Sequence, residues 1–203
     1  MAEATERGAG VRRPRSNWVP LGAATGVVVL LGAGWPLLNA VTPSTQALAS
    51  DDTVDLGSGG DYAASLDLPQ DGWNVDTTRT MADQQHVFTR GPVELDLVSI
   101  QPPQGVEATP EDLWSGMGTT SRVDDGAAEL SDPETATTQD GTRGLVGDLH
   151  TQDRTERAAV FPSPDGGFAV EMTLGGEHAT EADLAAVEDV VGAVSFEHQG
   201  ESS

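Results

Sequence analysis

The sequence predicts an α+β fold in which helices cover an antiparallel sheet, preceded by one transmembrane helix. Short segments of alternating polarity, separated by turns rich in Gly, Pro and Asp, predict strands paired in hairpins. Two segments that begin with a threonine cap predict helices, and one uncharged apolar segment lies near the N-terminus. We divide the 203 residues into a basic cytoplasmic leader (1–20), the apolar segment (21–41), a flexible linker (42–61), a folded domain (62–197) and a disordered tail (198–203).

Residues 21–41 are apolar enough to cross a membrane. As a helix they would be about 32 Å long, against about 30 Å for the hydrocarbon of a bilayer. Four arginines, Arg7, Arg12, Arg13 and Arg15, precede the segment, and basic residues remain on the cytoplasmic side. We therefore expect a single-pass protein of the cell membrane, with its N-terminus in the cytoplasm and its C-terminal domain outside.

A cleaved signal peptide is the alternative interpretation of the same segment. Ala47 and Ala49 form a small-x-small pattern of the kind that signal peptidase accepts. The apolar run is longer than the roughly 7 to 15 residues of an ordinary signal peptide, which favours retention. Cleavage after Ala49 would release a soluble secreted protein, so both interpretations export the domain.

Residues 42–61 are rich in Ser, Thr, Asp and Gly, which predicts a flexible linker. A calcium site could use Asp51, Asp52, Asp55 and Asp61, but the order of an EF-hand loop is absent. We expect no metal and no cofactor in this chain.

The first half of the domain predicts two hairpins and a helix. Residues 62–68 and 73–75 flank a Pro-Gln-Asp-Gly turn, and residues 86–89 precede 93–100 across a Gly-Pro turn. Thr109 is followed by proline and two acids, which is typical of a helix start. The helix presents Leu113, Trp114 and Met117 on one side and fades near Gly118; residues 123–134 are expected to be irregular.

The second half predicts two more hairpins and a last helix. Residues 135–139 turn at Asp140-Gly141 into 143–150, and residues 158–163 turn at 164–167 into 168–174. Thr180 caps a helix of about 181–191 whose apolar side chains fall on one face. The residues after it, Val-Ser-Phe at 194–196, close the domain.

This order of elements, with Tyr62 in the opening strand, Pro-x-x-Gly-Trp at 69–73 and Val-Ser-Phe at 194–196, resembles the PsbP-like α/β/α sandwich. That fold occurs in the photosystem oxygen-evolving subunit and in LpqN-type lipoproteins of the cell envelope. The resemblance covers about Tyr62 to Phe196 and implies a non-enzymatic adaptor or assembly role in the envelope. The chain lacks the lipid-attachment cysteine of the lipoproteins, so residues 21–41 would have to anchor it.

No motif of a known catalytic class is present, and we predict that the protein is not an enzyme. The sequence contains no Gly-x-Ser-x-Gly, no cysteine and no lysine, and its four histidines are dispersed without the i, i+4 spacing of a helical zinc site. A hydrolase with dispersed catalytic residues is the alternative. In that case His86 or His150 would lie in a cleft near a carboxylate with a shifted pKa.

The strong negative charge bears on the partner. The net charge is −23, and 31 of the 33 acidic residues lie after Ser50. Such a field repels nucleic acid and favours basic partners, although a salty habitat or a GC-rich genome also produces acidic proteins. We expect a protein or glycan partner in the envelope. Trp114 and Met117 are expected in the core or, alternatively, in a partly open pocket between the sheet and the Thr109 helix.

Overall fold

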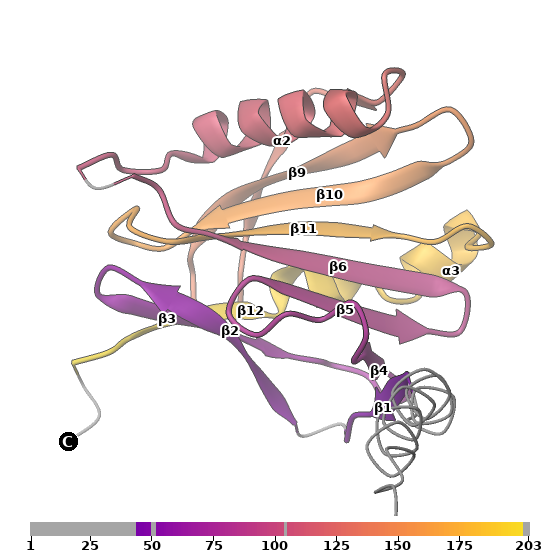
Figure 1. Ribbon diagram of the computed structural model, residues 1–203, viewed down its shortest axis with the longest axis horizontal. Helices are drawn as coiled ribbons and strands as arrows, with labels where there is room; N and C mark the ends of the chain where they lie inside the picture. Colours follow the sequence, from indigo (N-terminus) through magenta and orange to yellow (C-terminus); the bar gives the residue numbers. More distant parts are fainter. Residues whose placement is uncertain (1–43, 50–51, 104, 201–203) are drawn as a thin grey trace, which may run out of the picture. The chain divides into compact units, whose positions relative to one another are not determined.

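Two antiparallel β-sheets and one long helix make up the part of the chain that this computed structural model describes, residues 44–49, 52–103 and 105–200 (Figure 1). The larger, nine-stranded sheet has the order β1-β4-β5-β6-β11-β10-β9-β7, with β8 also paired to β9, and the smaller sheet has the order β12-β3-β2. The larger sheet contains β1 (Thr45–Ala47), β4 (Asn74–Asp76), β5 (Gln85–Arg90), β6 (Val93–Ile100), β7 (Glu129–Leu130), β8 (Glu134–Thr137), β9 (Arg143–His150), β10 (Thr155–Pro162) and β11 (Ala169–Gly175). The smaller sheet contains β2 (Thr53–Gly59), β3 (Tyr62–Asp67) and β12 (Val194–His198); the helices are α2 (Pro110–Asp124), α3 (Glu181–Ala185) and the 3₁₀ helix η1 (Glu188–Gly192).

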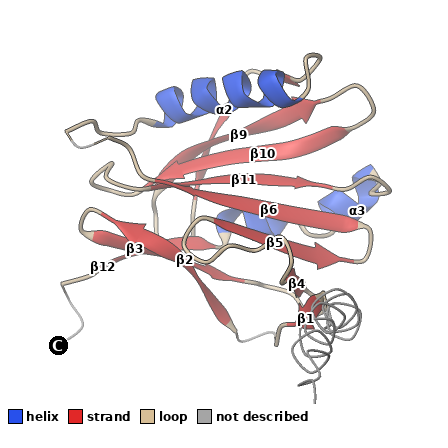
Figure 2. Cartoon of the chain, viewed as in Figure 1, coloured by secondary structure: helices blue, strands red, loops and turns tan. Residues whose placement is uncertain are grey.

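The larger sheet is covered on both faces over its central strands. Helix α2 lies on one face, and the smaller sheet, α3 and η1 lie on the other (Figure 2). Adjacent residues of β10 face opposite sides: Val160 packs with α2, Phe161 packs in the core beneath the smaller sheet, and both are fully buried. A strand buried on both sides has apolar residues at successive positions, as β10 does. The predicted antiparallel sheet is confirmed, but helices cover only part of it.

Helix α2 begins where the sequence predicts. The Thr109 side chain accepts a hydrogen bond from the Asp112 backbone N–H at 3.2 Å, and Pro110 occupies the first turn. The helix does not fade at Gly118 but continues to Asp124. Its Trp114 side chain reaches the sheet at Gly147, where a Cβ atom would lie 3.0 Å from the indole ring. A glycine is therefore needed beneath the tryptophan.

Three of the four predicted hairpins are confirmed. Strands β5 and β6, β8 and β9, and β10 and β11 each pair in antiparallel register. The fourth prediction was wrong, because β3 pairs with β2 and β12 while β4 pairs with β1 and β5. Leu68 and Trp73 are both buried. They hold the segment between them against the core, so it carries the chain from one sheet to the other instead of forming a tight turn.

The predicted flexible linker at 42–61 is also corrected, because β1 and β2 form within it. Leu56 is fully buried, and the strand bulges between Asp55 and Gly57, whose φ is 103°. The Ser99 hydroxyl donates to the Leu56 carbonyl at 2.5 Å, and the Gln101 amide donates to the Ser58 carbonyl at 2.9 Å. The glycines and polar residues that suggested a linker therefore serve a bulged edge strand.

The C-terminal elements also differ from prediction. Short strands β7 and β8 occupy part of the stretch expected to be irregular, and the last helix ends at Ala185, with η1 following it. Residues 194–198 form β12, in which His198 pairs with Tyr62, so the expected tail begins inside a strand. The Gln199 backbone N–H also donates to the Asp61 carbonyl at 2.9 Å.

Among residues 44–49, 52–103 and 105–200, no helix is long and apolar enough to cross a membrane. The leader (1–20) and the expected transmembrane helix (21–41) lie outside the described residues.

We predict opposite effects of alanine at Gly147, beneath the Trp114 ring, and at Gly116, on the exposed side of α2. Gly147→Ala should lower the free energy of unfolding by about 1 to 3 kcal/mol, because the added methyl group overpacks the Trp114 ring. Gly116→Ala should raise it by up to about 1 kcal/mol, because Gly116 lies in α2 with open space around it. Chemical denaturation of the two variants measures both changes, and a Gly147→Ala protein as stable as the wild type would contradict the packing.

Candidate functional site

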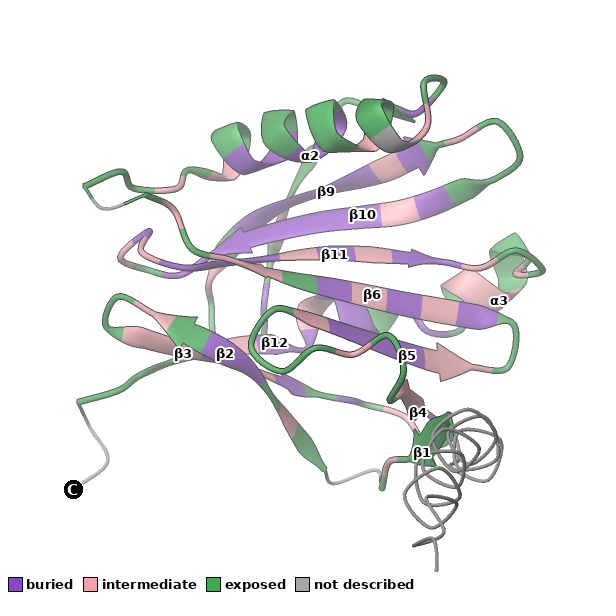
Figure 3. Ribbon diagram, in the orientation of Figure 1, coloured by how far each residue is buried: buried purple, intermediate pink, exposed green. Residues whose placement is uncertain are grey.

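The described residues cover only part of the face of the larger sheet that carries α2. Helix α2 packs over β9 and β10, and the turn of residues 77–84 lies over β5. Between them, β6 and β11 contain partly exposed residues (Figure 3), and the strand register places these residues on this face. We call this surface the groove and define it by the outward residues of these two strands and their neighbours: Glu94, Asp96, Val98, Glu171, Thr173 and Gly175, with Glu156 of β10 and Gln85 of β5 at its sides.

One end of the groove deepens into a cleft of about 470 Å³ beside the last turn of α2. Its lining contains one arginine and five acids, so the cleft is strongly negative. The charged residues that line it are Glu94, Asp96, Asp125, Glu156, Glu177 and Arg154.

Glu156 enters the cleft from β10 and is 8 % exposed. A Cβ atom on Gly175, its neighbour on β11, would lie 2.5 Å from the Glu156 carboxylate. Arg154 pairs with the same carboxylate, with 2.5 Å between its Nε and Oε1. Glycine at position 175 thus makes room for a buried acid, a relation that the sequence alone does not reveal.

Asp96 lies at the centre of the groove. The Gln85 side-chain amide donates to both of its oxygens, at 3.1 and 2.9 Å. Burial raises the pKa of the Asp96 carboxyl above its ordinary value; the Gln85 hydrogen bond opposes this, and the neighbouring charge of Glu94 adds to it. The Asp96 side chain is therefore fixed in a place where its ionised form is less stable than it would be in water.

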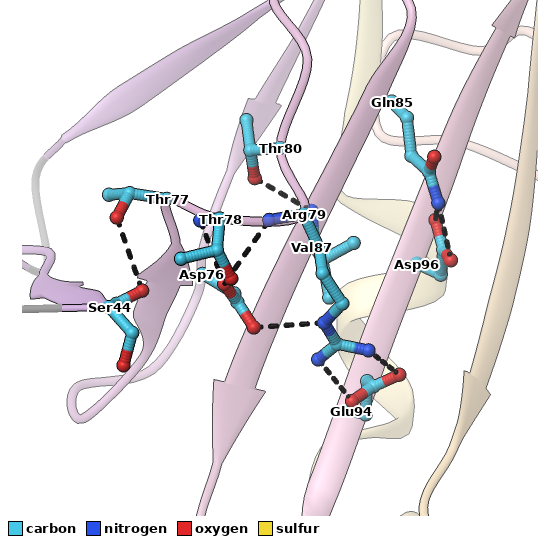
Figure 4. A network of polar contacts seen from close by, with 10 residues as sticks. All are labelled: Ser44, Asp76, Thr77, Thr78, Arg79, Thr80, Gln85, Val87, Glu94 and Asp96. Carbon is cyan, nitrogen blue, oxygen red and sulfur yellow. Dashed lines mark hydrogen bonds and ion pairs between the residues drawn. The ribbon is translucent and has the colours of Figure 1, made fainter. Parts of the chain in front are cut away.

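An arginine fixes the wall of the groove on the β5 side (Figure 4). Arg79 donates to Asp76 at 2.8 Å and makes a bidentate pair with Glu94 at 2.8 and 2.5 Å. The Thr78 hydroxyl and then Arg79 lower the pKa of Asp76 to about 2. The Thr80 hydroxyl accepts from the Val87 backbone N–H at 3.1 Å, which pins the turn to β5.

Glu171 differs from the other acids of the groove. It is half-buried on β11 beside Val98, and among the described residues it has neither a hydrogen-bond nor an ion-pair partner. Burial alone raises the pKa of its carboxyl to about 7. The sequence pattern did not identify Glu171 as unusual, because polar residues are expected at alternate positions of a strand with one exposed face.

The residues proposed for a pocket lie elsewhere. Trp114 and Met117 are 8 % and 7 % exposed and fill the contact between α2 and the sheet, and neither lines the cleft described above. Ala47 lies in β1 and Ala49 just after it; whether they mark a cleavage site stays a prediction. Of the acids considered for calcium, Asp52 and Asp55 accept backbone N–H groups nearby, and Asp51 lies outside the described residues.

His150 lies in a second cleft, of about 410 Å³, between the sheet and α3. Its Nδ1 atom is 3.0 Å from the Thr155 hydroxyl, and both residues are exposed. Two carboxylates of this cleft pair with Arg157 instead of His150: Asp148 lies 3.0 Å and Glu188 lies 3.6 Å from the Arg157 guanidinium. Within the described part of the chain, no group of three His, Asp or Glu side chains could hold a metal ion.

Comparison with known proteins gives structural likeness only. No protein-family model matches the sequence, and no curated protein matches it. The structure is similar to the solution structure of cyanobacterial PsbP from Synechocystis, with 16 % identity, a TM-score of 0.48, and coverage of 78 % of this chain and 99 % of that one. It is also similar to a crystal structure from Bacteroides thetaiotaomicron, with 12 % identity and a TM-score of 0.37; the match covers 76 % of this chain and 52 % of the other.

We predict that Glu171 destabilises the protein at alkaline pH. Its pKa of about 7 lies above the value of 4.5 for a free glutamate, so the stability it contributes is present below pH 4.5 and lost as the pH rises through 7. Allowing for partial exposure, Glu171→Gln should stabilise the protein by about 1 to 2 kcal/mol at pH 8 relative to pH 4.5.

Denaturant unfolding of the wild type and the variant at the two pH values measures this difference. Glu134→Gln, at an exposed position of β8, is the control and should show no such change. An equal effect of Glu171→Gln at both pH values would contradict the burial of an unpaired carboxylate.

Proposed function

We propose that residues 44–200 form a non-catalytic binding domain, held outside the cell membrane by residues 21–41, that docks a basic segment of a partner protein in the groove. Such a domain would act as an adaptor or assembly factor of the cell envelope. The observation that carries the proposal is Glu171, a half-buried carboxylate that has no partner among residues 44–49, 52–103 and 105–200, on a part of the sheet face that these residues leave uncovered. A cation placed over it would remove the cost of its ionised form.

The composition of the groove favours lysine or arginine as the docking side chain. Val98 is 39 % exposed beside Glu171, and Met81, which bridges to Gln85 at the edge of the groove, is 53 % exposed. Lysine and arginine lay an apolar stem on such surface while the charged head reaches an acid. Asp96 and the acids of the cleft provide further acceptors along the same line of strands.

The wider charge supports the same partner. With a net charge of −23, the chain attracts basic segments at long range and repels acidic ones. Two arginines, Arg79 and Arg154, already pair with acids of the groove, whereas Glu171 has no such cation among the residues that the structure describes. A partner's basic side chain would take that place.

We predict that an arginine-rich peptide binds the full-length protein in the groove. The double change Asp96→Asn with Glu171→Gln should weaken binding at least about tenfold, or about 1.4 kcal/mol. Wild-type affinity should rise from pH 6 to pH 8, because Glu171 ionises near pH 7, and should fall as salt is added. Isothermal titration measures all three effects.

The matched control is Glu129→Gln with Glu134→Gln, which removes the same charge from exposed positions of β7 and β8. If both double variants weakened peptide binding equally, the peptide would be attracted by net charge alone, and the groove would not be its binding site. A neutral oligosaccharide that bound the groove without salt dependence would instead identify a glycan ligand.

The position of β1 supports retention of the N-terminal segment. Ala47 pairs with Asn74, and the Leu48 backbone N–H donates to the Trp73 carbonyl at 3.0 Å. Leu48 also packs against the core. Cleavage after Ala49 would remove this strand and these contacts from the folded domain.

We predict that the intact chain is found in the membrane fraction, with a reporter fused after Ser203 accessible from outside the cell. Mass spectrometry of that fraction should detect peptides from residues 1–20. A mature chain that begins at Ser50 in the culture fluid would support the secreted alternative, and a cytoplasmic reporter would contradict export altogether.

A further inference from the structure

A buried histidine lies between the two sheets, on the side of β5 opposite to the groove. His86 is 6 % exposed, and its ring is stacked on that of Phe88 with centroids 6.2 Å apart and planes 8° apart. Its cross-strand neighbour on β6 is Leu97. The Nδ1 atom is fully buried and has no hydrogen-bond partner in the part of the chain that the structure describes. An orphaned polar atom in this position costs free energy and needs an explanation.

Two carboxylates act on the ring from different elements. Asp55 belongs to the bulge of β2, and Asp83 belongs to the turn before β5. Together with Gly57 they line a cleft of about 320 Å³ that is open to solvent. The other groups that neighbour His86 on β5 and β6, Phe88 and Leu97, are apolar, and Asp96 lies on the opposite face of the sheet.

The neutral ring is the form that fits this place. Burial lowers the pKa of the His86 imidazole, and Asp55 and Asp83 oppose this without cancelling it. As the folded pKa is below the value of 6.5 for a free histidine, stability falls when the pH drops below 6.5 towards the folded pKa. A protonated ring would be more stable in the open cleft, beside the two carboxylates.

The element that covers this site, β2, is paired with a neighbouring strand, β3, on one side only. Strand β2 is an edge strand, and side chains of Ser99 and Gln101 bond to its Leu56 and Ser58 carbonyls. A Cβ atom on Gly57 would lie 3.3 Å from the Asp83 Cα atom, so the bulge rests directly on the turn. Asp83 itself has a left-handed φ of 62°. Such a contact opens locally at a smaller cost than the whole domain.

We propose that His86 is a proton-operated latch: when the ring is protonated it moves into the cleft beside Asp55 and Asp83, and the bulge of β2 separates from the turn of residues 77–84. This device is independent of the proposed ligand. It also reaches the groove, because Gln85, the residue before His86, donates to Asp96 on the other face.

Hydrogen–deuterium exchange with mass spectrometry tests the latch in the full-length protein. Exchange at the imidazole carbon should give His86 a pKa below 6.5. The backbone amides of residues 53–59, corrected for intrinsic exchange rates, should lose protection by about tenfold between pH 7.5 and pH 5, because protonation of His86 favours the open state. Strands β9 and β10 should keep their protection.

The variants separate His86 from other groups that titrate in the same range. His86→Phe should abolish the pH response of β2, whereas His198→Phe should retain it, since His198 is an exposed histidine of the same small sheet. Glu171→Gln should also retain it. A wild-type β2 with the same protection at both pH values, an unchanged response in His86→Phe, or a response lost in Glu171→Gln would each overturn the latch.

A second variant keeps the test decisive if His86→Phe does not fold. Asp83→Asn removes one of the two favourable charges, and asparagine tolerates the left-handed backbone at this position. The midpoint of β2 opening and the pKa of His86 should both shift to lower pH. An upward shift, or none, would contradict the proposed role of the ring.

Discussion

The structure depends on covering both faces of one large sheet with a single long helix and one small sheet. Strand β10 is buried on both sides, so α2 on one face and the smaller sheet on the other are both required. Helix α2 is too narrow to cover more than β9 and β10, because one helix is only about 10 to 12 Å in diameter. The part of this face that the described residues leave open, over β6 and β11, is the groove. The candidate site therefore exists because α2 covers only β9 and β10.

Local signals in the sequence identified some elements whose partners are near in the chain, although they missed the hairpin of β2 and β3. The Thr109 cap defines α2, and the turn at Gly91 defines the β5–β6 hairpin. The signals failed where pairing is distant: Ser65 and Ser195, 130 residues apart, are paired across β3 and β12. Leu56 is fully buried amid glycines and acids, and nothing local distinguishes its segment from a linker.

The candidate site was harder to predict than the fold, because 33 acids make any single acid uninformative. Environment separates them. Asp140 is partly buried, which raises the pKa of its carboxyl, but hydrogen bonds from Thr138, the Phe196 backbone and Thr142 outweigh burial and lower it. The Asp140 carboxylate thus accepts a backbone N–H at the edge of β12. Asp96 and Glu171 have raised pKa values because burial prevails, and a position that costs stability is a better candidate for function than one that adds to it.

The turn of residues 77–84 and the first two residues of β5 join the two proposals, since these residues have side chains on both faces of the sheet. Arg79 and Gln85 fix acids of the groove, and His86 lies beneath β2. The proposed groove and the proposed latch respond to acid in the same direction. Near pH 8 Glu171 is ionised and the proposed latch is closed; at pH 5 Glu171 is neutral and the proposed latch is open. Basic partners would therefore bind best above neutral pH, by two independent routes that act on opposite faces of one sheet.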